Sequence, residues 1–156
     1  MEKLIDGTYS HWENDHYGKL ALIIIADQFS RNIFRRTAKA FAQDYIGLRI
    51  AKKIVEGGKL REYDFAERLF IIMPYCHDEN REHTRYAVEL VVNLNKDMES
   101  VEGKDLNCHM NIKGLQAHDL LVQKFGRYPQ RNEVLGRKNT KAEQEHLDGG
   151  AERWGQ

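Results

Sequence analysis

Apolar positions recur at helical spacing along the first long segment of the chain, residues 17–34. One stripe along this segment consists of Leu22, Ile25, Ala26, Phe29 and Ile33. Ile23 and Ile24 extend the apolar character around the circumference, as expected for a central helix. A short buried strand over residues 20–26 is the alternative, but the uninterrupted continuation to Arg35 favours the helix.

The next predicted helix begins near Asp44, the expected N-cap, and stops at Gly57-Gly58. Its apolar face consists of Ile46, Ile50 and Ile54. Asp64, with Glu67 three residues later, predicts a capping box that opens a helix over residues 65–73. Because proline has no backbone N–H, we expect Pro74 to interrupt this helix.

Three further helices complete the pattern. One covers residues 79 to about 98, with Tyr86, Leu90 and Leu94 at spacings of four, and another runs from about Cys108 to Phe125. A short last helix is predicted between Thr140, which pairs with Glu143 in a second capping box, and Gly149-Gly150. Polar, glycine-containing loops are expected over residues 99–107 and 126–139.

These elements predict an all-α fold of five to six helices, arranged as antiparallel helical hairpins. The chain has 156 residues and two prolines, which suits a single helical domain over residues 1–156. Within it we expect a variable lead-in over residues 1–16, an arginine-rich loop over 126–139 and a flexible tail over 150–156. No strict 34-residue repeat is present.

Composition limits the classes of partner. The 24 Lys and Arg residues balance 24 Asp and Glu residues, which argues against nucleic-acid binding through bulk positive charge. The longest apolar run, residues 20–26, is far shorter than the roughly 20 residues that span a bilayer. Cys76 and Cys108 lack a CxxC spacing, so we expect a reduced intracellular chain, although one disulfide between them stays open.

Two distant segments share an aromatic residue, an Arg-Asn step and a further arginine. Guanidinium groups set among apolar residues need acceptors, because each offers five donors. The candidate residues, forming either an anion-binding site or a structural polar network, are Asp27, Gln28, Arg31, Asn32, Arg35, His77, Arg127, Arg131, Asn132 and Arg137. One interpretation is a clamp that joins the first long helix to the loop over residues 127–137, with Asp27 paired to Arg31. The other is a pocket that gathers Arg31, Arg35, His77 and Arg131 around a phosphate or carboxylate.

The sequence patterns that could indicate a metal site or a catalytic nucleophile are weaker than the arginine pattern. Residues 77–83 contain two histidines and three carboxylates, but His77 and His83 are six apart and no HExxH motif is present, so we expect no metal and no cofactor. Ser10, Ser30 and Ser100 lie outside any GxSxG motif. A thiolate pair of Cys76 with His77 is the alternative to a half-buried structural cysteine. No catalytic residue is therefore assigned.

Four sequence blocks, in this order, resemble the domain-of-unknown-function 924 family over about residues 10–147. The blocks are LALIIIADQFSRNIFR (residues 20–35), FAQD (41–44), PYCHDE (74–79) and RYPQRN with LGR (127–132 and 135–137). The resemblance implies an all-helical, tetratricopeptide-like fold and brings no established activity. Ser30 replaces the family's proline, and Cys76-His77-Asp78-Glu79 replaces Glu-His-Ser-Glu. Family members usually have an earlier segment with a Phe-Trp-Phe-Gly-like phrase, so we expect apolar surface here to be covered by something else, such as a neighbouring chain.

From these observations our leading hypothesis is a non-enzymatic helical scaffold or accessory subunit that binds other protein chains in a larger assembly. A fold of helical hairpins and the lack of a recognisable catalytic set favour it. The alternative hypothesis is a small-molecule anion-binding protein or enzyme that uses the cluster of Arg31, Arg35, His77 and Arg131.

Overall fold

The structure, a computed structural model, describes residues 1–99 and 112–150. The predicted loop after Glu99, the predicted helix start near Cys108 and the predicted tail fall largely outside these residues. Every regular element in the described part of the chain is a helix, which confirms the all-α class. The alternative of a strand over residues 20–26 is therefore wrong.

The elements, in chain order, are α1 (Glu2–Ile5), the 3₁₀-helix η1 (Ser10–Asn14), α2 (His16–Ile24), the π-helix η2 (Ile25–Phe29), α3 (Ser30–Ile33), η3 (Ala38–Ala40), α4 (Asp44–Glu56), η4 (Leu60–Glu62), α5 (Phe65–His77), α6 (Arg81–Glu99), α7 (Ile112–Phe125), η6 (Pro129–Arg131) and α8 (Lys141–Asp148). The helices α2, η2 and α3 follow one another without a break and form one long rod.

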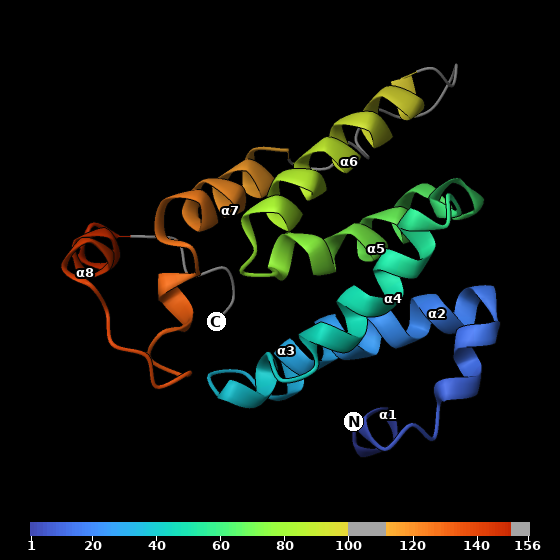
Figure 1. Ribbon diagram of the computed structural model, residues 1–156, viewed down its shortest axis with the longest axis horizontal. Coiled ribbons are helices and arrows are strands. Elements are labelled where there is room, and N and C mark those ends of the chain that lie inside the picture. Colours follow the sequence, from blue (N-terminus) through green and yellow to red (C-terminus); the bar gives the residue numbers. More distant parts are fainter. Residues whose placement is uncertain (100–111, 151–156) are drawn as a thin grey trace.

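Helix α5 lies at the centre of the molecule, since it packs against α2, α4, α6 and α7. Figure 1 shows α2, α4, α5, α6 and α7 running in alternating directions, so that consecutive helices form antiparallel pairs. The main apolar core lies between them and includes Ile23, Ile50, Ile71 and Val91, each almost fully buried. A smaller cluster of Leu121, Val122 and Tyr128 joins α7 to η6. This packing brings the carboxyl end of α5 beside η2 and η6.

The π-helix η2 changes which residues of the long rod face the core. The Ser30 N–H donates to the Ile25 carbonyl, five residues earlier, so one extra residue is inserted in the turn. The sequence predicted Phe29 and Ile33 on the inward stripe, but their side chains are 52% and 63% exposed. Asp27 and Ser30 are buried instead. The predicted apolar stripe was wrong after residue 26, because a regular 3.6-residue period does not allow for the inserted residue.

Three of the predicted helix boundaries are confirmed by their capping geometry. Gly57 and Gly58 end α4, with Gly58 at φ +68°, a conformation that favours glycine. Capping boxes open α5 at Asp64 and α8 at Thr140. Helix α7 ends at Phe125, as the pattern predicts.

Two predictions at helix ends were wrong for tertiary reasons. The N-cap of α4 is Gln43, and the Asp44 carboxylate binds the Arg31 guanidinium instead of the helix N-terminus. Helix α5 continues through Pro74 to His77. Contacts beyond the proline compensate for the lost backbone hydrogen bond, because the Tyr128 hydroxyl donates to the Cys76 carbonyl and His77 binds Asp27.

Two helix glycines should respond in opposite directions to the same substitution. A Cβ at Gly47 would lie 3.6 Å from Ala26 Cβ and from Pro74 Cγ, which is ordinary contact. Gly47→Ala should therefore raise the free energy of unfolding by about 0.5–1 kcal/mol, because alanine loses less backbone entropy. A Cβ at Gly18 would collide with the Trp12 carbonyl oxygen, so Gly18→Ala should lower the free energy of unfolding by about 1–3 kcal/mol. Urea denaturation measures both, and a loss of stability in Gly47→Ala would contradict the packing of α4.

Candidate functional site

The π-helix η2 places Asp27 in contact with three residues that line the candidate site. The side chain is only 1% exposed, so its carboxylate needs partners inside the protein. It receives a hydrogen bond from Gln28 Nε2 at 2.5 Å and an ion pair from Arg31 Nη1 at 2.8 Å. The predicted pairing of Asp27 with Arg31 is thus present. The third partner is His77, whose Nδ1 lies 2.7 Å from Asp27 Oδ1.

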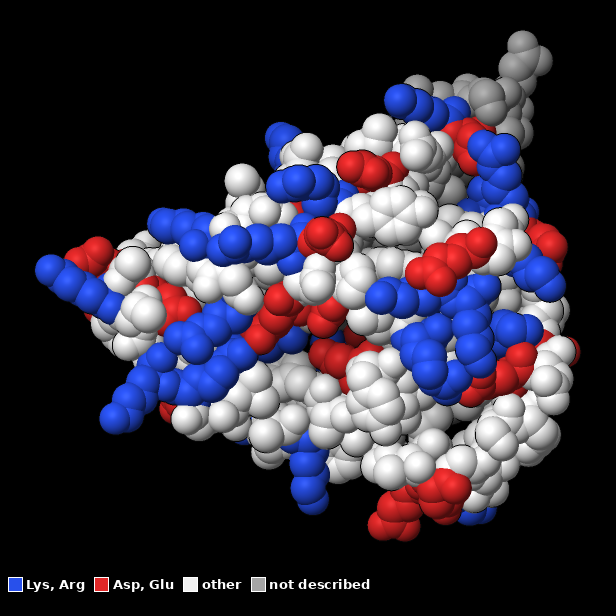
Figure 2. Space-filling view, in the orientation of Figure 1, with Lys and Arg blue, Asp and Glu red and all other residues white. Residues whose placement is uncertain are grey.

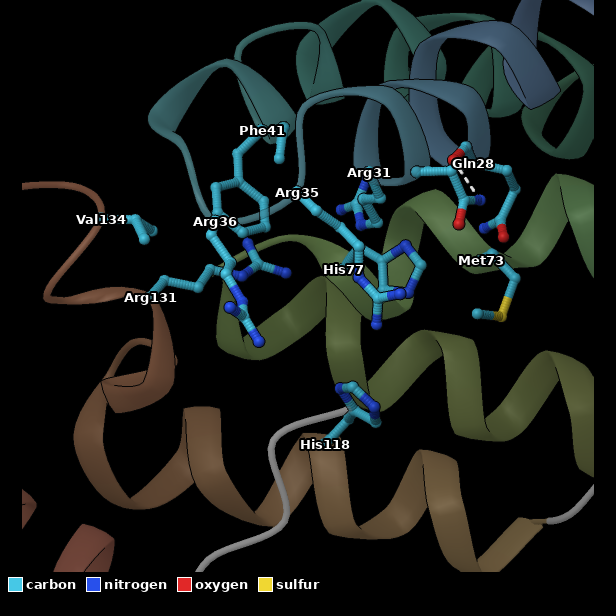
Figure 3. Close-up of a pocket in the computed structure, with 12 residues that line it drawn as sticks. Gln28, Arg31, Arg35, Arg36, Phe41, Met73, His77, His118, Arg131 and Val134 are labelled. Carbon is cyan, nitrogen blue, oxygen red and sulfur yellow. Dashed lines mark hydrogen bonds between the residues drawn. The ribbon is translucent and has the colours of Figure 1, made fainter. Parts of the chain in front are cut away.

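His77 is the last residue of α5, and its ring orientation is set by Asp27. An ionised carboxylate only accepts hydrogen bonds, so His77 Nδ1 must carry the hydrogen in this contact. In the neutral ring the lone pair is then on Nε2, on the other side of the imidazole. The His77 side chain lines a cavity, and Figure 3 shows it among Arg31, Arg35 and His118.

Asp44 connects the two arginine segments. Arg31 binds it through two parallel hydrogen bonds, Nη1 to Oδ1 and Nη2 to Oδ2, both 2.9 Å. Arg131 approaches the same carboxylate, but its Nη1 lies 3.8 Å from Asp44 Oδ2, too far for a hydrogen bond. The structure therefore brings Arg31 and Arg131 together around a carboxylate that only Arg31 binds closely.

Arg131 is 5% exposed and is enclosed mainly by aromatic rings. Its guanidinium carbon lies 4.6 Å from the centre of the Phe41 ring and 4.4 Å from that of Tyr128. Its Nε is buried and has no hydrogen-bond partner among the described residues. The guanidinium is thus packed against two aromatic rings and has few hydrogen-bond acceptors.

A cavity of about 310 Å³ opens between these groups. Its polar lining consists of Gln28, Arg31, Asn32, Arg35, Arg36, His77, His118 and Arg131, and its apolar lining of Ala40, Phe41, Met73 and Val134. We call this cavity the arginine pocket. In Figure 3, His118 projects from α7 towards His77, while Arg131 and Val134 approach from the opposite wall of the site to Met73. Elements from both halves of the chain therefore build the pocket.

The pocket shifts several pKa values. Burial alone would raise the pKa of Asp27, but the His77 ring and the Arg31 charge outweigh it and lower the pKa to about 2. Burial, with further contributions from His77 and Arg131, lowers the pKa of His118 to about 3, so this ring is neutral near pH 7. Burial also lowers the pKa of Arg131 and raises that of Asp44 despite its two arginine neighbours. A buried charge without close compensation is costly, and Arg131 is such a charge.

Three candidate residues from the sequence lie outside the pocket and support its wall. Arg127 binds the buried Glu143 at 2.6 and 2.8 Å, and Arg137 binds Glu79 at 2.5 and 2.9 Å. Asn132 Nδ2 donates to Asn139 Oδ1 at 2.7 Å. These contacts fix the predicted arginine-rich loop against α8 and against the turn between α5 and α6, and so hold η6 in place.

Sequence reasoning missed several contributors to the site. Asp44 and Phe41 lie in the FAQD block that supports the family resemblance, and an acidic residue there could have been matched to the need of the arginines for acceptors. His118 occurs in an ordinary amphipathic helix, and its sequence context contains no signal of a site. Its ring lies 6.1 Å from that of His77 and 5.4 Å from that of Tyr128.

The structure also bears on the weaker hypotheses drawn from the sequence. Cys76 is a buried free thiol whose pKa is raised to about 12 by burial, and its neighbour His77 binds Asp27, so the two do not form an activated pair. Cys108 lies outside the described residues. Residues 1–99 and 112–150 contain no group of three His, Cys, Asp or Glu side chains placed to hold a metal ion. Within the same residues, no helix is long and apolar enough to cross a membrane.

One face of the molecule has mixed charge. On the face in Figure 2, basic side chains gather in small groups with acidic side chains beside them. This agrees with the equal numbers of basic and acidic residues in the chain. The concentration of guanidinium groups in the arginine pocket is therefore a local feature rather than part of a general positive surface.

Fold and site together define an all-helical protein with a pocket lined by arginine and histidine. The chain belongs to the family described as bacterial protein of unknown function (DUF924), whose model matches residues 1–151. It is similar to the solved structure of a protein of unknown function, ATU0120 from Agrobacterium tumefaciens, with 27% identity and a TM-score of 0.77. That similarity covers 95% of this chain and 77% of the other. No curated protein shows a significant match.

The buried Asp27 should make stability depend on acid. Its pKa is lower in the folded chain than the ordinary value of 3.8, so the ionised form stabilises the fold above about pH 4. This contribution is lost as the pH falls towards 2. The difference in unfolding free energy between wild type and Asp27→Asn should shrink by roughly 2 kcal/mol over that interval, measured by urea denaturation at each pH. The same difference for Met73→Leu, a pocket variant without a titrating group, should stay constant, and equal behaviour of the two variants would refute the assignment.

Proposed function

We propose that the protein binds a small organic anion, with a phosphate or carboxylate group, in the arginine pocket. The observation that supports this most directly is the incomplete pairing of Arg131. A side chain that is 5% exposed, with a buried Nε that lacks a partner and a carboxylate no nearer than 3.8 Å, is costly to keep in the unliganded protein. A bound anion supplies the missing acceptors.

A purely structural clamp fits the geometry less well. Asp44 already gives both oxygens to Arg31, so it has little capacity to neutralise a second guanidinium. The arginines that do hold the loop, Arg127 and Arg137, each make two close hydrogen bonds to their own carboxylate. Arg131 differs from both, which favours a binding role over a structural one.

The lining also indicates the shape of the ligand. Ala40, Phe41, Met73 and Val134 form apolar walls beside the charged groups. A volume of about 310 Å³ is at the lower end of the range for small-molecule sites. The ligand is therefore a small molecule with an anionic head and a compact apolar body.

The variant Arg131→Met distinguishes a ligand-binding role of Arg131 from a role as a structural clamp. Methionine keeps much of the apolar packing and removes an uncompensated charge, so the variant should be at least as stable as wild type without ligand. Its affinity for anions should fall at least about tenfold, equal to about 1.4 kcal/mol. Thermal shift and calorimetry with inorganic phosphate, phosphate esters and dicarboxylates measure both properties.

The control for this experiment is Arg61→Met, because the Arg61 side chain is 79% exposed in a surface ion pair with Asp97. It should retain the anion response of wild type. Loss of about 3–5 kcal/mol of stability in Arg131→Met, together with no anion response in wild type, would establish the clamp instead.

A second candidate function is the scaffold that binds other protein chains. It is favoured by the exposed side chains of Phe29 and Ile33, which lie four residues apart on one side of the rod. A tetratricopeptide-like stack of hairpins, implied by the family resemblance, would suit this role. The two functions are compatible, since the exposed pair and the arginine pocket use different side chains.

A charged residue in this exposed pair should abolish binding to another chain without unfolding the protein. Phe29→Asp with Ile33→Asp adds charge to an already solvated surface, so the melting temperature should change little. Affinity capture followed by quantitative mass spectrometry should then lose a partner that wild type retains. Leu120→Asp, at a residue 68% exposed on α7, is the matched control and should keep it. A partner retained by both variants would exclude this surface as its binding site.

A further inference from the structure

The described lining of the arginine pocket contains one kind of group that can act as a nucleophile. Among the described residues that line it there is no serine, threonine, cysteine, lysine or carboxylate, and the guanidinium groups stay protonated. The two imidazoles, His77 and His118, are therefore the candidates for chemistry on a bound anion. Of these two, His77 is hydrogen-bonded through its Nδ1 to the buried carboxylate of Asp27.

The contact between Asp27 and His77 has two chemical consequences. It fixes the tautomer, with the hydrogen on Nδ1 and the lone pair on Nε2, which a nucleophile requires. It also places a negative charge beside the ring, so positive charge that develops on the imidazole during bond formation is stabilised. Asp27 remains ionised in this role because its carboxylate pairs with Arg31 and accepts a hydrogen bond from Gln28.

The charge around the pocket suits a phosphoryl group better than a single carboxylate. Arg31, Arg35, Arg36 and Arg131 line the pocket, and Arg31 pairs with the carboxylates of Asp27 and Asp44. Several guanidinium groups around one cavity can bind the oxygens of a phosphoryl dianion. Guanidinium groups also stabilise the equatorial oxygens of a phosphoryl group during its transfer.

We infer that His77 accepts a phosphoryl group on Nε2 from a small acyl or aryl phosphate held in the arginine pocket. This inference rests on the anion-binding function proposed above. The lone pair of Nε2 forms a bond to phosphorus as the bond between phosphorus and the acyl or aryl oxygen breaks. The leaving oxygen departs with its electron pair as a carboxylate or phenolate. Water then attacks phosphorus, the nitrogen–phosphorus bond breaks, its electron pair returns to Nε2, and dihydrogen phosphate leaves with both protons of the water.

The restriction to acyl and aryl phosphates follows from the acids that the lining lacks. An alkoxide leaving group needs a proton, but the described lining has no carboxylic acid, and His118 is neutral near pH 7. A carboxylate or phenolate leaves without one. The neutral His118, 6.1 Å from His77 between ring centres, is placed to hydrogen-bond a bound phosphoryl group rather than to supply a proton.

The test is to incubate the purified protein with acetyl phosphate or p-nitrophenyl phosphate and to locate any bound phosphoryl group. Alkaline quenching preserves phosphohistidine, which ³¹P NMR and peptide mass spectrometry identify. We expect one phosphoryl group per chain on Nε2 of His77 and none in His77→Gln. His83→Gln is the matched control, because His83 also binds a carboxylate, Asp78, at 2.5 Å but lies outside the pocket. It should be labelled as wild type is.

Mapping the label in wild type decides the question even if a variant folds poorly. Labelling spread over several histidines, or p-nitrophenyl phosphate hydrolysis that persists in His77→Gln, overturns the inference. Inorganic phosphate that binds to wild type by calorimetry without any label on His77 also overturns it and leaves the anion-binding function intact. If wild type binds none of these anions, the proposed anion-binding function is itself excluded.

Discussion

The buried carboxylate of Asp27 is the constraint on which the rest of the site depends. A carboxylate that is 1% exposed must be compensated within the fold, and it is met by His77 from α5 and by Gln28 and Arg31 from its own rod. The contact ties the carboxyl end of α5 to η2. It also explains why α5 can continue past Pro74, since the last turn is held by partners outside the helix.

The π-helix makes this arrangement possible. A regular α-helix would keep Phe29 inward, whereas the inserted residue buries Asp27 and Ser30 and leaves Phe29 exposed. Burying a carboxylate and exposing an aromatic ring both reduce stability relative to a regular amphipathic helix. Such local exceptions to stable packing are typical of functional positions, and π-bulges occur frequently at functional sites.

The parts of the structure that sequence could predict are those with local causes. Helical periodicity and the capping residues Asp64, Thr140 and Gly58 act within a few residues, so the helices and several of their ends followed from the sequence. The need of Arg31 and Arg131 for acceptors also pointed to their association. The acceptor was not predictable, because Asp44 had an equally good local role as an N-cap, and only the tertiary approach of Arg31 decides between the two. His118 has no local signal at all, since its position in the site depends on how α7 packs against α5.

Aromatic packing explains how Arg131 can remain buried with few acceptors before a ligand arrives. Phe41 and Tyr128 lie 4.6 and 4.4 Å from its guanidinium carbon and provide cation–π attraction. Such contacts provide no oxygen or nitrogen acceptor, so the N–H groups of the guanidinium can still bind other acceptors. The rings therefore hold the group in a defined orientation without competing for its hydrogen bonds. Tyr128 is itself fixed by its hydroxyl contact with the Cys76 carbonyl, one residue before His77. The orientations of Arg131 and His77 are thus coupled through one short stretch of backbone, so under the proposed function the guanidinium and the imidazole would be positioned together before an anion binds.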